Sequence, residues 1–288
     1  MPSMRLHTIL LLLPITLTSA CSPATPSADP AAVGAAATPR QAAPAPAPVP
    51  GASAKPAIAQ SFRQDMPYAE LRKRFLAENW LPLREPACWH NIGGDAEVCN
   101  ALPEVDSCSA DGYCSMRFAN RELGMQARIV TYGPYDSWNS DKGSTALKVR
   151  SLDVQAAPSA AAPSCPSQDF QQFLQRFASD KAVQRQFTAP FVKVLELRSD
   201  GEGDSTQQVY VAGAEYRDFD LEHDGSGFHF VDAQGHVDPA PLRVQISQPD
   251  AHARLVRYAF NMSEGNAFRF EERNGCWYLV EDPQAPAP

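Results

Sequence analysis

Phe170-Gln-Gln-Phe-Leu-Gln-Arg-Phe177 is the stretch that decides the fold of this chain. Its apolar residues recur at i, i+3, i+4 and i+7, which places Phe173 and Leu174 on the same helix face as the two terminal phenylalanines. A second, shorter helix is expected after Asp180, whose side chain would cap it. An apolar stripe of this kind must be buried against another layer of secondary structure.

Eight strand-like runs follow these helices. Each run has a period of two and is separated from the next by Gly, Asp, Asn or Pro, as in a meander. The runs are 191–197, 208–212, 216–222, 228–231, 242–246, 255–261, 267–273 and 276–281. Helices followed by antiparallel strands predict an α+β meander domain over residues 165–283.

A Cys-containing α+β domain is predicted over residues 61–155. Asp65-Met66-Pro67 is typical of a helix start, with a capping Asp and a Pro in the first turn. Strand-like runs follow at 114–119, 125–132 and 146–154. The Ala/Pro-rich residues 156–164 would be a linker. The predicted fold class is therefore α+β, with two small domains that each pack helices on an antiparallel sheet.

The N-terminus has the pattern of a secretory signal. One positive charge, Arg5, precedes an apolar run over residues 9–17, and small residues then lead to Cys21. The run is too short to span a bilayer. Residues 1–20 are predicted to be a signal peptide, and residues 21–60 a disordered Ala/Pro-rich tether with no bulky side chain to bury.

Cys21 resembles the lipidated cysteine of the bacterial lipoprotein lipobox. Its thiol would take a diacylglycerol, and its new amine an acyl chain such as palmitate. Thr18 stands where that family has Leu, and an ordinary signal peptide followed by a chance cysteine is the alternative. Ser22, rather than Asp, implies sorting to the outer membrane. The resemblance implies a lipid-anchored protein of the bacterial cell envelope, at the periplasmic face.

Six cysteines are left for the folded part, and an even number behind an export signal predicts three disulfide bonds. They are Cys88, Cys99, Cys108, Cys114, Cys165 and Cys276. Their clustering favours two bonds among the first four and a Cys165–Cys276 bond as the third. The alternative is a zinc site, but the chain has no Cys-x-x-Cys pair.

The chain is acidic, with a formal charge of −8 that becomes −9 when Arg5 leaves with the signal peptide. This charge argues against a nucleic-acid partner and against electrostatic attachment to anionic lipid, because both need clustered Lys and Arg. We therefore expect membrane attachment through the lipid alone, and a protein or cell-wall partner for the folded part.

Two resemblances cover most of the folded part. Residues 68–72, 79–83 and 102–105, with Cys108 and Cys114, resemble a small domain of uncharacterised bacterial envelope proteins. In pattern this segment is also similar to the repeat unit of β-lactamase inhibitor protein. Residues 170–187 and 276–279 resemble another uncharacterised family of exported bacterial proteins. Helix, curved meander and final Trp strand are similar to the cone-shaped fold of nuclear transport factor 2. Both resemblances imply a fold, and neither implies an activity.

One candidate binding site is the segment that holds Asp220, Glu222 and Asp224. With Gly225 these residues match the first half of a calcium loop, but Val231 stands at the twelfth position, where a bidentate Glu is required. Asp-Gly between two alternating runs is also a strong hairpin-turn signal, and we favour the turn. The turn would be a polar loop held on a rigid sheet, where binding residues tend to lie.

The other candidate binding site is the polar loop 261–266, which offers Ser263, Glu264 and Asn266. Ser263 and Glu264 with His252 upstream could form a hydrolase set. The chain has no Gly-x-Ser-x-Gly elbow, however, so a catalytic serine is not predicted.

Two further polar clusters are expected to be solvent-exposed. Three histidines could converge on a metal, and three glutamates could supply the paired carboxylates of a glycoside hydrolase. Alternation with apolar residues predicts instead the wet face of a sheet. These residues are His223, His229, His236, Glu271, Glu272 and Glu281.

The sequence therefore predicts no catalytic residue, no cofactor and no metal site, and its leading interpretation is a non-enzymatic binding module. An acidic body on a tether suits an inhibitor or immunity protein that acts on a basic toxin or cell-wall hydrolase. The alternatives are a hydrolase-like enzyme with a pocket in the second domain and a structural component of the envelope. A pocket with a convergent acid and base would favour the enzyme.

Overall fold

The computed structural model describes residues 56–94, 96–135, 138–139, 146–158, 164–200, 203–259 and 265–283. The predicted signal peptide (1–20), Cys21 and most of the predicted tether (21–60) lie outside these residues, as do Ser263 and Glu264. The chain divides into residues 1–51 and 52–288, and only the second unit is described below. Among the described residues, no helix is both long and apolar enough to cross a membrane.

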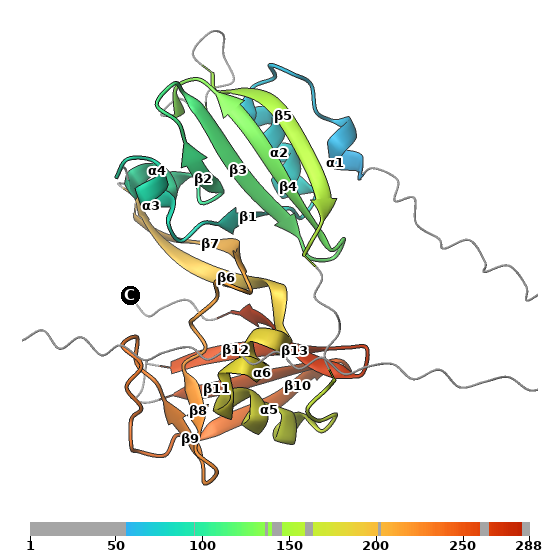
Figure 1. Cartoon of the computed structure of the whole chain (residues 1–288), viewed down its shortest axis with the longest axis vertical. Coiled ribbons are helices and arrows are strands. Elements are labelled where there is room, and N and C mark those ends of the chain that lie inside the picture. Colours follow the sequence, from blue (N-terminus) through green and yellow to red (C-terminus); the bar gives the residue numbers. More distant parts are fainter. Residues whose placement is uncertain are drawn as a thin grey trace, which may run out of the picture. The chain divides into compact units, whose positions relative to one another are not determined.

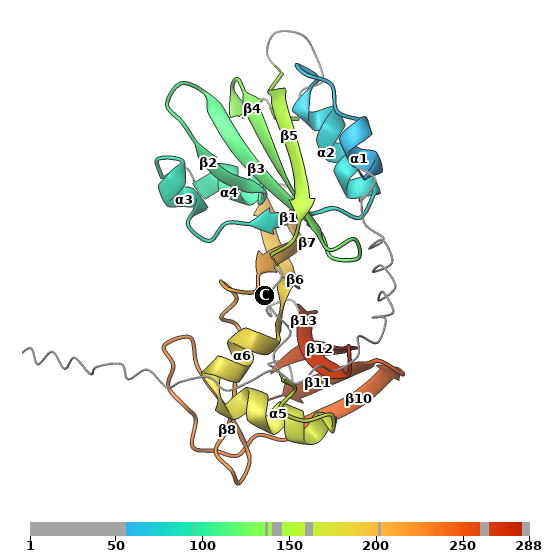
Figure 2. The same cartoon turned by 45° about the vertical axis from the view of Figure 1, so that its right-hand side comes forward.

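The first segment packs two helices on a sheet. Figures 1 and 2 show α1 and α2 along one face of strands β3 to β5. Its elements are α1 (Ala57–Gln60), α2 (Tyr68–Ala77), β1 (Leu81–Arg84), α3 (Cys88–Asn91), α4 (Ala96–Ala101), β2 (Val105–Cys108), β3 (Tyr113–Asn120), β4 (Met125–Tyr132) and β5 (Lys148–Ala156). The strand pairs within this segment are antiparallel, with β3 between β1 and β4 and with β2 also on β3.

The predicted cap of α2 is wrong. The helix begins at Tyr68 after Pro67, and no side chain of the described residues caps it. The backbone amide of Tyr68 donates to the carbonyl of Leu147 at 2.8 Å, so the neighbouring chain already satisfies it. Asp65 has a φ of 64° and pairs its carboxylate with Arg150.

The motif residues Tyr68, Arg72 and Glu104 form a buried cluster. Glu104 is fully buried, and its Oε1 accepts from the Tyr68 hydroxyl at 2.6 Å and from Arg72 Nε at 2.5 Å. The guanidinium of Arg72 also lies 5.1 Å from the ring centre of Trp138. A buried carboxylate paired in this way is costly to break, so these residues stabilise the first segment.

The second segment continues the sheet and adds two helices. Its elements are α5 (Phe170–Ser179), α6 (Lys181–Phe187), β6 (Thr188–Asp200), β7 (Gly203–Ala212), β8 (Leu221–His223), β9 (Phe228–Phe230), β10 (Val244–Asp250), β11 (Ala253–Ala259), β12 (Gly265–Arg273) and β13 (Cys276–Asp282). Strands β8 and β9 form a hairpin of their own. The remaining strands follow the order β10-β11-β12-β13-β6-β7-β1-β3-β4-β5.

The expectation of purely antiparallel sheets is wrong at two places. β13 pairs with β6 in parallel, and β1 pairs with β7 in parallel, so the eleven strands of this sheet are mixed. Both parallel pairs join strands that no hairpin turn connects, and a turn is what would impose the antiparallel direction. The α+β class holds, with sheet predominating, and strand pairing runs through both predicted domains.

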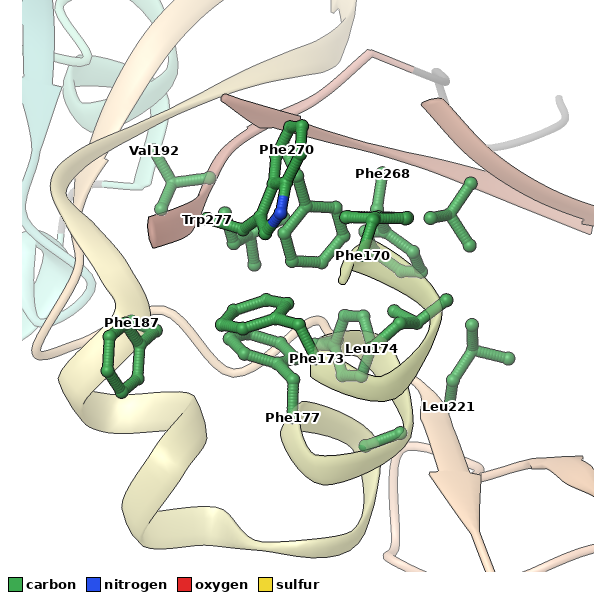
Figure 3. Packing of buried hydrophobic residues seen from close by; sticks show 14 of the residues in the cluster. Phe170, Phe173, Leu174, Phe177, Phe187, Val192, Leu221, Phe268, Phe270 and Trp277 are labelled. Carbon is green, nitrogen blue, oxygen red and sulfur yellow. The ribbon is translucent and has the colours of Figure 1, made fainter. Parts of the chain in front are cut away.

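The face of α5 is buried as its spacing predicts. Figure 3 shows Phe170, Phe173 and Phe177 pointing from the helix toward Phe270 and Trp277 of the sheet. Phe173 and Phe177 are fully buried, and Phe177 lies edge-on to Phe270 at a centroid distance of 5.2 Å. This contact attaches α5 firmly to the sheet.

Both helices of the second segment begin at an aspartate. Asp169 accepts from the amide of Gln172 at 2.9 Å, which caps α5. Asp180 accepts from the amide of Ala182 at 2.7 Å, as predicted for the cap of α6. These caps satisfy amides that have no partner inside the helix.

Three disulfide bonds are present, namely Cys88–Cys99, Cys108–Cys114 and Cys165–Cys276. The pairing expected for Cys165 and Cys276 is therefore the pairing in the structure. This bond ties the chain before α5 to the start of β13. The indole of Trp277 adds a hydrogen bond to the carbonyl of Gln168 at 3.0 Å beside it.

The predicted strand 216–222 forms only from Leu221 onward. Tyr216 and Phe219 precede it without strand pairing, yet both are buried, and Phe219 lies 4.9 Å from Phe177 between ring centres. These two aromatic rings anchor the irregular segment to the core. The anchored segment is the one that carries Asp218 and Asp220.

Candidate functional site

A cavity of about 620 Å³ is lined mainly by residues of the second segment, with Arg84 and Pro86 of the first segment at its wall. Its lining includes the carboxylates of Asp218 and Asp220, which precede β8, and of Asp282, at the end of β13. Tyr258 of β11 and Asn266 of β12 line it as well. We call it the acidic cavity, and these five residues define it.

Asp220 is held by two residues that face each other across a strand pair. Tyr258 and Asn266 are partners in the β11–β12 register. The Tyr258 hydroxyl donates to Asp220 Oδ2 at 2.5 Å, and the Asn266 side-chain amide donates to the same oxygen at 3.4 Å. Both contacts place the carboxyl of Asp220 over the sheet.

Asp282 is held by a different tyrosine. The Tyr216 hydroxyl donates to Asp282 Oδ2 at 3.0 Å, and the residue is only 8% exposed. Its backbone position is fixed because Asp282 is paired with Val194 in the parallel β13–β6 ladder. The last residue of the sheet thus places a carboxyl inside the cavity.

Each of these two carboxyls keeps one oxygen without a partner. Oδ1 of Asp220 and Oδ1 of Asp282 are buried and accept no hydrogen bond within the described part of the chain. Burying a polar atom without a partner costs free energy, so most such atoms in folded proteins are satisfied. Two unsatisfied acceptors that line one cavity indicate a place where a ligand would supply the donors.

The carboxyls also perturb one another. Burial raises the pKa of Asp282 to about 7, and the negative charge of Asp220 adds to the rise, while hydrogen bonding from Tyr216 and Asn266 opposes it. Burial likewise raises the pKa of Asp220 against the hydrogen bonds from Tyr258 and Asn266. The cavity therefore stabilises protonated carboxyls unless a positive charge is nearby.

The two arginines at this cavity each have a partner, although Arg84 Nε is buried without a hydrogen bond among the described residues. Arg84 pairs with Glu196, and Arg217 donates from Nη1 to the carbonyl of Tyr216 at 2.8 Å. The acidic cavity thus retains an excess of acceptors and of negative charge. No group of three or more His, Cys, Asp or Glu among the described residues is arranged to hold a metal ion.

Of the predicted loop residues that the structure describes, Asp220 and Asn266 lie together at the acidic cavity. Asp224 instead makes the hairpin turn favoured over a calcium loop. Its Oδ1 accepts from the amides of Ser226 at 2.8 Å and Gly227 at 2.9 Å, and Gly225 has a φ of 98°. These hydrogen bonds lower the pKa of Asp224. Glu222 lies on β8, outside the acidic cavity.

The expectation of exposed histidines is wrong for His229, which is 9% exposed. Its Nδ1 lies 2.9 Å from the carbonyl of Asp238, and its Nε2 lies 3.3 Å from Asp224. His229 therefore fastens the β8–β9 hairpin to the chain that follows it. His236 is exposed and lies 3.0 Å from Asp232.

The three glutamates considered for glycoside cleavage are ion-paired or exposed. Glu271 contacts Arg121 at 3.2 Å and Arg273 at 3.1 Å, and Glu281 contacts Lys193 at 2.6 Å. Glu272 lies 3.3 Å from the exposed His252. These contacts agree with the wet face of a sheet.

A larger cavity of about 980 Å³ lies in the first segment. Arg150 lines it, but this side chain pairs with Asp65 and stacks on Tyr132 at 4.9 Å. We therefore place the candidate site in the acidic cavity.

Sequence reasoning missed Tyr216, Asp218, Tyr258 and Asp282. The one available signal is the alternation of Tyr216, Asp218 and Asp220 with other residues, which puts acids on one side of an extended segment. No local pattern marks Asp282, which simply follows a predicted strand.

No protein-family model matches this chain, and no curated protein sequence matches it. Among solved structures, an NTF2-like protein from Bacteroides fragilis is similar over 74% of this chain and 77% of that chain, with 11% sequence identity and a TM-score of 0.30. A TM-score this low supports no argument about shared fold or function.

Proposed function

We propose that this chain is a lipid-anchored protein of the bacterial cell envelope that binds a partner without turnover, and that it binds through the acidic cavity. The partner class that suits it is a basic protein, such as a toxin or cell-wall hydrolase that the chain would inhibit. The acidic charge of the whole chain supports this class, because opposite charges speed association.

The observation that carries the proposal is the pair of unpartnered oxygens, Asp220 Oδ1 and Asp282 Oδ1. A site of this kind is incomplete in the free protein and is completed by donors from outside. Because tyrosine hydroxyls position both carboxyls, little ordering would be needed on binding.

Affinity capture from envelope extract tests the proposal, with the purified full-length chain as bait. We expect a basic protein to be retained by the wild type and by Asp153→Asn, an exposed residue of β5. The double variant Asp220→Asn/Asp282→Asn should lose it. Capture should weaken as salt rises. Equal capture by the double variant and the Asp153 control would refute the cavity as the binding site.

A second candidate function is catalysis, and one observation favours it. Burial and Asp220 raise the pKa of Asp282 to about 7, and a general acid or base works best with a pKa near the ambient pH. A reaction that turns over in envelope extract and stops with Asp282→Asn, but not with Asp153→Asn, would establish an enzyme in place of a binder.

A further inference from the structure

The acidic cavity presents more carboxylates than cations, since Arg84 and Arg217 stand against Glu196, Glu215, Asp218, Asp220 and Asp282 in its lining. Tyr216 and Tyr258 give their hydroxyl protons to Asp282 and Asp220, so neither proton is available to a ligand. The side-chain amide of Asn266 is turned to Asp220 as well. Asp220 Oδ1 and Asp282 Oδ1, which have no partner among the described residues, can each accept a hydrogen bond from a ligand.

Asp282 is the residue that best indicates a preformed ligand site. It is 8% exposed, it lines the cavity, and its Oδ1 has no partner among the described residues. Its Oδ2 is fixed by Tyr216, which leaves Oδ1 to the cavity. A buried carboxylate oxygen is best satisfied by a donor that also carries positive charge.

The rest of the wall suits an organic ligand. Val194, Leu195 and Phe230 line the same cavity. The ring of Phe230 lies 6.3 Å from that of Tyr258 between centroids, and aromatic faces attract cations. A volume of about 620 Å³ is within the range of small-molecule sites.

We propose that the acidic cavity binds a primary ammonium or guanidinium group, carried either by a small organic amine or by a Lys or Arg side chain of a partner. The inference rests on the proposed function and names the chemistry that this site recognises. The cation would donate to Asp282 Oδ1 and Asp220 Oδ1, and its carbon chain would lie along the apolar wall.

Calorimetric titration of the purified full-length protein with agmatine tests the inference. Agmatine carries one ammonium and one guanidinium, and N-butylurea is its neutral comparison. We expect agmatine to bind the wild type and Asp153→Asn equally at pH 8. Asp220→Asn and Asp282→Asn should each weaken binding by about tenfold or more, as the loss of a charged hydrogen bond predicts.

A measurement on the wild type alone guards against variants that fail to fold. Between pH 8 and pH 5.5 the affinity for agmatine should fall by about tenfold or more, because a proton would compete for Asp282. The groups that face Asp282 are Tyr216, Asp218, Asp220 and Asn266. Affinity that stays constant over this range would contradict the inference.

The source of the cation is read from a second titration with Gly-Lys-Gly and Gly-Arg-Gly. Binding of agmatine alone identifies a small amine, and binding of the tripeptides identifies a side chain of a partner.

Equal binding of N-butylurea, binding of no cation, or unchanged binding in both Asn variants would overturn the inference. Capture of a partner through the cavity without any cation binding would overturn it while leaving the proposed function intact. Agmatine binding without partner capture would support the cation site and refute the proposed binding of a partner.

Discussion

The hydroxyl of Tyr258 donates to Oδ2 of Asp220 at 2.5 Å, although 38 residues separate the two in the chain. This hydrogen bond lowers the pKa of Asp220 against the rise that burial causes. Burial and the same carboxylate raise the pKa of Tyr258, so the proton stays on the tyrosine. The hydrogen bond therefore holds the carboxyl of Asp220 in place and partly offsets the effect of burial on its pKa.

Tyr258→Phe should weaken ligand binding and lower stability by about 1 to 2 kcal/mol, because Asp220 loses its best donor while staying buried. Tyr278→Phe is the matched control, since its hydroxyl has no hydrogen-bond partner among the described residues. Calorimetry and thermal unfolding measure the two effects. Equal behaviour of the two variants would show that the hydroxyl of Tyr258 is unimportant.

Asp282 should make the protein less stable as pH rises. Its folded pKa is about 7, whereas an aspartate of the unfolded chain titrates near its ordinary 3.8. The folded state therefore holds a proton that the unfolded state releases. This contribution is fully present below about pH 4 and is lost as pH rises through about 7.

The loss should amount to at most about 4 kcal/mol in the free energy of unfolding. Asp282→Asn should remove most of this pH dependence and stabilise the protein at pH 8, whereas Asp153→Asn should keep the wild-type profile. Urea unfolding at pH 4 to 8 measures the free energy of unfolding of each variant as a function of pH. A profile for Asp282→Asn that parallels the wild type would mean that another group titrates.

Loss of the Cys165–Cys276 bond should be strongly destabilising. The two cysteines are 111 residues apart, and closing so long a loop in the unfolded chain is worth about 4 to 5 kcal/mol in the chain-entropy model. Cys165→Ser/Cys276→Ser should therefore melt well below the wild type. Cys108→Ser/Cys114→Ser, which opens a separation of only 6 residues, should cost less.

Phe173→Ala should be far more damaging than Gln171→Ala. Phe173 is fully buried between α5 and the sheet, and truncation should cost about 3 to 5 kcal/mol. Gln171 is exposed on the same helix and should be close to neutral. Similar melting temperatures would mean that the cluster tolerates the cavity by collapsing.

Cys21→Ala should leave the chain without lipid, either free in the periplasm or as an uncleaved precursor. The anchoring chemistry needs that thiol, and two or more acyl chains hold a protein stably where one does not. Palmitate labelling followed by fractionation measures the result. Label that persists in the variant would mean that another residue is modified.

The sequence alone determined the features that depend on near neighbours. The spacing of Phe170 to Phe177 is enough to define the buried face of α5, because a helix repeats every 3.6 residues. Asp180 marks the start of α6, and Asp224-Gly225 marks a turn, because each satisfies amides within three residues of itself. Cysteine clustering was sufficient to pair Cys165 with Cys276.

Only the tertiary structure decided where the sheet is parallel and which carboxyls are buried. The parallel pairing of β13 with β6 joins strands far apart in the chain, and no local turn dictates it. Asp282 meets Tyr216 across 66 residues, and its unpartnered oxygen results from which donors reach it and which do not. An aspartate at the end of a strand reads the same in sequence whether water or protein surrounds it, because desolvation is a property of the packed structure.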